Sequence, residues 1–104
     1  MTEAQLVRCL ERAAAHQYRA LTYLRDTRNP QAALALPTAR ARLIWALEHV
    51  MHARSLLRQA RDGAPRPDLA DQLERQLTRL DGVETAVTRR LQELGAELDE
   101  SIAD

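Results

Sequence analysis

The apolar residues between positions 38 and 61 recur on two sides of a helix. At 100° per residue, one stripe contains Leu43, Leu47, Val50, Met51 and Leu57, with Ile44 at its edge. The second stripe contains Trp45, His49, His52 and Leu56. A surface helix shows one apolar stripe, so a helix that is apolar on two sides needs neighbours on both. The pattern therefore predicts that residues 38–61 form the central helix of a bundle.

An amphipathic segment precedes this helix. Thr2 and Gln5 have the spacing of a capping box, which predicts a helix that starts there and ends near Asp26. Pro30 and Pro37 bracket a stretch for which we expect only a short helical turn near residues 30–36. Gly63 is placed to end the central helix in the left-handed conformation. The apolar stripe of the first helix contains Leu6, Leu10, Ala13, Ala14, Gln17, Leu21 and Leu24.

The third segment is long and regular, with apolar residues about 3.7 positions apart from Leu69 to Ile102. Four of them repeat every eleven residues, which is typical of nearly straight packing: Leu69, Leu80, Leu91 and Ile102. Gly82 and Gly95 lie inside it and permit either close helix approach or a bend. A helix over 69–102 is about 51 Å long and one over 38–61 about 36 Å, so the longer helix should overhang. We predict one all-α domain, residues 1–104, folded as an antiparallel bundle of three main helices with a long C-terminal helix.

Composition agrees with a helical, intracellular chain. Aromatic residues make up only 3% of the sequence, so the core must consist of Leu and Ala, which favour helices. The single Cys9 excludes an internal disulfide and fits a reducing compartment. The sequence has neither an apolar run of about 20 residues nor the apolar core of a signal peptide. We expect a cytoplasmic protein without a transmembrane segment.

Charge is unevenly distributed along the chain. Residues 1–66 hold eleven Arg and five acids, and residues 67–104 hold four Arg and ten acids, so the halves carry +6 and −6. This asymmetry favours contact between the acidic and basic segments, and it argues against a nucleic-acid partner. Arg54, Arg58 and Arg61 share one edge of the central helix, where we expect them to pair with acids of the third helix. The alternative is that they collect phosphates or an acidic partner.

Candidate chemistry is sparse. His49 and His52 share a helix face with Glu48, a spacing that can bring two imidazoles and a carboxylate to one metal ion. No HExxH motif or paired Glu-x-x-His motif supports such a site, so we favour a partly solvated helix interface and expect no metal and no cofactor. His16 is a weaker candidate still. Cys9 has no base among its helical neighbours, and no phosphate-binding or nucleophile motif is present, so we predict a protein that is not an enzyme.

Residues 40–57, with Trp45, His49 and His52, resemble a helix of PhoU-like domains, specifically the cytosolic helical domains of sodium/phosphate cotransporters. The resemblance covers residues 6–61 and implies a regulatory module linked to phosphate transport. PhoU proteins bind metal clusters through repeated Glu-x-x-x-Asp motifs. Only Glu100 and Asp104 fit that motif here, so the metal site is not carried over. The long amphipathic C-terminal helix, with its Leu91-Gln-Glu-Leu94 stretch, is also similar to small export chaperones of flagellar and type III secretion systems.

We therefore predict a non-enzymatic interaction or regulatory module that self-associates as a homodimer and binds a protein partner. The alternatives are an export chaperone and a metal-binding bundle that uses His49 and His52. On a single chain the end of the third helix should expose an apolar stripe, because no other helix is long enough to cover it. The predicted interface consists of Leu91, Leu94, Leu98, Ile102, Trp45 and Leu56.

Overall fold

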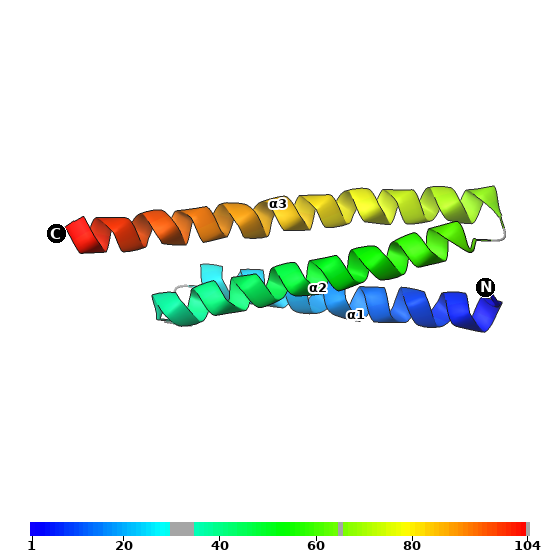
Figure 1. Cartoon of the computed structure of the whole chain (residues 1–104), viewed down its shortest axis with the longest axis horizontal. Helices are drawn as coiled ribbons and strands as arrows, with labels where there is room; N and C mark the ends of the chain where they lie inside the picture. Colours follow the sequence, from blue (N-terminus) through cyan, green and yellow to red (C-terminus); the bar gives the residue numbers. More distant parts are fainter. Residues whose placement is uncertain (30–34, 65, 104) are drawn as a thin grey trace.

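The computed structural model describes the whole chain except residues 30–34, 65 and 104, and it describes side chains as far as residue 96. Three helices follow one another: α1 (Glu3–Arg28), α2 (Leu36–Asp62) and α3 (Pro67–Ala103). Successive helices run in opposite directions (Figure 1), so the predicted all-α antiparallel bundle is confirmed. The short turn predicted near residues 30–36 falls largely outside the described residues.

The helix ends follow the local sequence, with one exception. Thr2 and Gln5 form the predicted capping box, in which each backbone N–H donates to the other residue's side chain, at 2.8 and 3.2 Å. Gly63 does not have the predicted left-handed conformation, because its φ is −95° and its ψ is 4°. Its N–H still donates to the carbonyl of Gln59 at 3.0 Å, so the α-helical hydrogen bonding continues up to Gly63 and the helix ends there without a left-handed cap. What Gly63 provides is space, since a Cβ there would lie 2.9 Å from Cβ of Met1.

The central position predicted for residues 38–61 is confirmed. α2 packs against both other helices, whereas α1 and α3 contact each other far less. The molecule measures 58 × 18 × 17 Å, so the three helices form a rod with a rounded cross-section and not a flat layer. α3 has 37 residues, or about 56 Å, and extends past the first turn of α2 (Figure 1). Among the described residues, no helix has the length and apolar character needed to cross a membrane.

The buried residues of each helix recur every seven positions, the repeat of coiled-coil packing. On α2 one series is entirely alanine and is at most 4% exposed: Ala39, Ala46, Ala53 and Ala60. On α1 the matching series is Leu6, Ala13, Ala20 and Thr27, and on α3 it is Leu73, Leu80, Val87 and Leu94. The eleven-residue repeat predicted for α3 does not describe the core, because Leu69 and Leu91 are only partly buried.

Alanine also explains why the large residues of α2 were partly misassigned. Leu47 is half-buried, and Ile44 and Met51 are 43% and 65% exposed, although all three were placed in a core stripe. The buried surface of α2 consists of this alanine series together with Leu43, Val50, Leu56 and Leu57. Leu47, Ile44 and Met51 lie beyond its edge, and Ile44 faces the α2–α3 groove.

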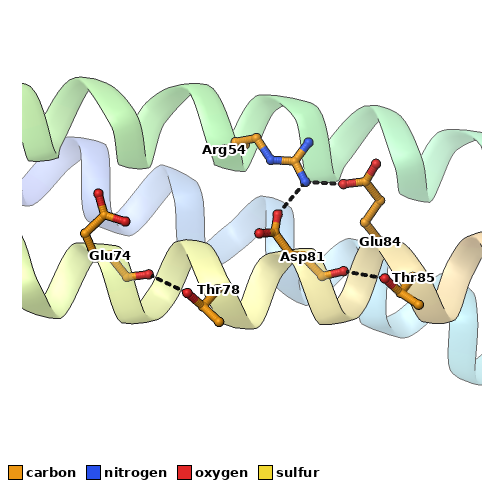
Figure 2. A network of polar contacts seen from close by, with 6 residues as sticks. All are labelled: Arg54, Glu74, Thr78, Asp81, Glu84 and Thr85. Carbon is orange, nitrogen blue, oxygen red and sulfur yellow. Dashed lines mark hydrogen bonds and ion pairs between the residues drawn. The ribbon is translucent and has the colours of Figure 1, made fainter.

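Of the three arginines of α2 that were predicted to pair with acids of α3, Arg54 and Arg61 do so. Arg54 donates to Asp81 at 3.0 Å and also contacts Glu84, and Arg61 donates to Glu74 at 2.6 Å. Figure 2 shows Arg54 reaching from α2 to both carboxylates on α3. These pairs lie at the solvent-exposed edge of the contact, so each contributes about 0–1 kcal/mol. Burial of leucine supplies most of the α2–α3 stability.

Gly82 and Gly63 give a matched test of this packing. A Cβ at Gly82 would meet nothing within 4 Å, so close helix approach does not require glycine there. We expect Gly82→Ala to raise the free energy of unfolding by about 0.5–1 kcal/mol, because alanine favours a helix. Gly63→Ala should lower it, because the new methyl group would collide with Met1. Denaturant unfolding measures both changes, and a loss at Gly82 would contradict the open environment assigned to it.

Candidate functional surfaces

An apolar groove lies between the first half of α2 and the last part of α3, which diverge toward the C-terminal end of α3 in Figure 1. Its volume is about 640 Å³. The polar residues that line it are Arg40, Thr88 and Gln92. α1 contributes no residue to the lining. The larger apolar lining residues are Leu36, Pro37 and Ile44 from α2, and Leu91 and Leu94 from α3.

The residues predicted to form an interface fall into three groups. Leu91 is half-buried in the groove and Trp45 is 49% exposed, so both remain accessible. The expectation that Leu94 is exposed on a single chain is wrong, because Leu94 is 5% exposed within the core cluster, against which Leu36 packs. Leu56 is likewise 8% exposed and belongs to the core of its own chain. The side chains of Leu98 and Ile102 lie outside the described part.

The outer face of α2 extends the apolar surface beyond the groove. Ile44 lines the groove and is 43% exposed, and Met51, 65% exposed, lies two helical turns further on the same side. Trp45 lies about 100° round the helix from Ile44, against Tyr23 of α1. Large apolar side chains on one outward helix face mark an interaction surface more often than a chance distribution does. The groove and this face therefore form one candidate binding surface.

A second candidate is a cluster of imidazoles in the α1–α2 seam, which we call the histidine cluster: His16, His49 and His52. Nδ1 of His16 lies 2.8 Å from Nδ1 of His49, a hydrogen-bond distance. The ring centroid of His16 lies 5.1 Å from that of His49 and 5.2 Å from that of His52. These are the three histidines of the sequence, so residues 33 positions apart meet in one place.

His16 was the member that sequence reasoning set aside, and Glu48 had been grouped with His49 and His52 in its place. A signal for His16 was present: Cys9, His16 and Tyr23 are spaced by seven on α1, in step with the buried alanines Ala13 and Ala20. Residues spaced by seven lie along one side of a helix, so Cys9, His16 and Tyr23 border the contact that Ala13 and Ala20 make with α2.

Two further rings continue the cluster along the seam. Tyr23 of α1 lies with its ring centroid 6.0 Å from that of His49 and 6.1 Å from that of Trp45. The Tyr23–Trp45 pair meets edge to face, a favourable aromatic arrangement. An unbroken row of rings thus runs from His52 through His16, His49 and Tyr23 to Trp45.

The electrostatics of the cluster favour neutral imidazoles. Burial, and then the nearby His49, His52, Arg19 and Arg12, lower the pKa of His16 below its usual 6.5. Burial, Arg19 and His52 lower the pKa of His49, against a smaller upward effect of Glu48. The His16–His49 hydrogen bond also requires one ring nitrogen without a proton, to act as acceptor. Both effects favour the neutral form of the pair.

The same surroundings oppose a bound cation. Arg12 and Arg19 act on the cluster with positive charge, and Glu48 is the one carboxylate that acts on His49. In the described part of the chain, no three His, Cys, Asp or Glu side chains are arranged to hold a metal ion. Cys9 is half-buried and lines a shallow pocket with Arg8 and Arg12, which supply no general base.

No protein-family model, curated protein or solved structure matches this chain. The resemblances to PhoU-like domains and to export chaperones therefore remain predictions from the sequence.

The metal question has a direct test. We expect protein purified without a histidine tag to carry no stoichiometric transition metal, because the cluster lies beside two arginines and lacks a third converging ligand. Elemental analysis by mass spectrometry measures this. One equivalent of zinc or iron in the unmodified chain, absent from the His49→Ala, His52→Ala double variant, would contradict it.

Proposed function

We propose that this chain is a non-enzymatic interaction module that acts by self-association, with the groove of each copy receiving the C-terminal part of α3 from the other. The observation that carries the proposal is the apolar groove, which continues through Ile44 onto the exposed face of α2. A monomer rarely leaves an apolar hollow of this kind beside exposed residues such as Ile44 and Met51 unless something binds there.

Charge complementarity supports a second copy as the occupant. Residues 93–104 contain five acids and no cation, and residues 1–66 carry a net charge of +6. Arg40 lines the groove that would receive this acidic segment. Because the last turns of α3 extend beyond α2 (Figure 1), they project from the body of the molecule. Each copy thus carries one groove and one projecting acidic end. In a two-fold dimer, the acidic end of each copy would occupy the groove of the other.

Apolar burial supplies most of the affinity in this arrangement. Rim pairs between Arg and carboxylates contribute about 0–1 kcal/mol each, and they weaken with salt. Complete burial of one Ile or Leu side chain contributes about 1.5–3 kcal/mol. The dimer should therefore survive moderate salt and respond strongly to changes in the groove lining.

Ile44 is the position for the test, because it lines the groove and is 43% exposed, so its replacement leaves the core intact. We expect Ile44→Glu to raise the dimer dissociation constant at least tenfold, since the change removes apolar burial and adds a charge beside an acidic partner. Light scattering after size exclusion, over a range of concentrations, measures the constant. Circular dichroism should remain unchanged.

Tyr18→Glu is the matched control. Tyr18 is an exposed apolar residue on α1, 68% exposed, and does not line the groove. Its replacement should leave the dissociation constant within about twofold. A wild-type chain that is monomeric at tens of micromolar, or equal weakening by both variants, would overturn the proposed dimer. The links to phosphate transport and to export stay predictions from the resemblances.

A further inference from the structure

The histidine cluster joins two helices through a contact that depends on protonation. The 2.8 Å contact between Nδ1 of His16 and Nδ1 of His49 is a hydrogen bond only while one of these nitrogens lacks a proton. A proton added to one ring leaves a hydrogen bond in place, because the neutral ring can keep its Nδ1 unprotonated as the acceptor. Only when both rings are protonated are both nitrogens donors, and the contact then becomes a repulsion between two cations.

We propose that His16 and His49 form a proton-sensitive contact, beside His52, that closes the α1–α2 seam near neutral pH and loosens it in mild acid. The function proposed for the groove does not enter this inference, because none of the three histidines lines the groove.

The charges around the cluster reinforce the effect of protonation. From α1, Arg12 and Arg19 act on His16, and Arg19 also acts on His49. From α2, His52 acts on both rings and the exposed Glu48 acts on His49. Tyr23 stacks beside His49 as a neutral ring. Among the described groups, no charged residue of α3 acts on either ring. The charged surroundings of the cluster are therefore two arginines and a single carboxylate, Glu48.

The seam itself makes this contact important. At the level of the cluster, the buried residues are four alanines, Ala13 and Ala20 on α1 and Ala46 and Ala53 on α2, together with Val50 on α2. Alanine buries little apolar area, so each pair contributes less than a pair of leucines would. The rings at the edge of the seam therefore hold a larger share of the α1–α2 contact than edge residues usually do.

The direction of the pH dependence follows from the lowered pKa values of His16 and His49. In the unfolded chain both histidines titrate near 6.5, and in the folded chain they titrate lower. The folded state is therefore favoured fully above pH 6.5 and loses stability as the pH falls through 6.5 toward the folded values. For each histidine that stays neutral only when folded, the unfolding equilibrium constant rises about tenfold per pH unit in that window.

The experiment compares denaturant unfolding at pH 7.5 and pH 5.5, followed by the fluorescence of the single Trp45. The variants are His16→Gln with His49→Gln, which removes the titrating pair, and His52→Gln, which leaves the pair in place as the matched control. Glutamine keeps polar atoms of similar size without titrating. Most carboxylates titrate below this range and affect all three proteins alike.

We expect the unfolding constant of the unmodified chain to rise at least twofold more between pH 7.5 and 5.5 than that of the double variant. His52→Gln should keep most of the wild-type response. Hydrogen exchange, corrected for its intrinsic pH dependence, should show α1 losing protection in acid before residues 67–81 of α3. NMR titration of the unmodified chain should give pKa values below 6.5 for His16 and His49, which tests the inference even if a variant fails to fold.

Three results would overturn the inference. The first is the same pH response in the unmodified chain and the double variant. The second is a measured pKa of 6.5 or above for both His16 and His49. The third is a zinc titration that raises the unfolding midpoint of the unmodified chain but not of His16→Gln, which would assign the cluster to metal binding.

Discussion

The close approach of α1 and α2 along their alanines is the constraint on which the other features depend. Ala39, Ala46, Ala53 and Ala60 are buried at every seventh position of α2, and Ala13 and Ala20 repeat at the same interval on α1. Because His16 contacts both His49 and His52, the antiparallel register places Ala13 level with Ala53 and Ala20 level with Ala46. Side chains this small permit a close helix contact, and the rings of the histidine cluster lie along one edge of it.

Both candidate surfaces follow from this arrangement. At one edge of the seam the rings from His52 to Trp45 form a row, where burial and neighbouring arginines lower the pKa of His16 and His49. On the other side of α2, leucines and the Arg54 and Arg61 pairs hold α3. The groove lies where α2 and α3 diverge, and α3 continues past the start of α2 (Figure 1).

The spacing of Thr2 and Gln5 predicted the capping box, and the periodicity of apolar residues was enough to predict three antiparallel helices and the central place of α2. It failed where small residues carry the packing, because the interpretation gave weight to Leu47, Ile44 and Met51 and passed over the alanines between them. Leu94 was expected to be exposed because helix lengths alone suggested that nothing covers it. The first turn of α2 begins at Leu36, earlier than predicted, and packs against the cluster that contains Leu94.

The candidate site was harder to predict than the fold for a related reason. His49 and His52 are neighbours on one helix, so their proximity can be read from spacing alone. The position of His16 depends on the register between two helices, and that register is set by alanines whose importance shows only in the packed structure. The space required at Gly63 was equally hidden in the sequence, because it is set by Met1, which precedes the first helix and meets Gly63 only in the folded chain.

The alanine seam is tested most directly by enlarging one of its members. Ala46 is completely buried in the seam, whereas Ala14 is an exposed alanine of α1 in the same bundle. Overpacking of a filled core costs about 1–3 kcal/mol. We expect Ala46→Leu to lower the free energy of unfolding by that amount and Ala14→Leu to change it by less than about 0.5 kcal/mol. Equal effects of the two variants, or a more stable Ala46→Leu protein, would contradict a seam held close by alanine.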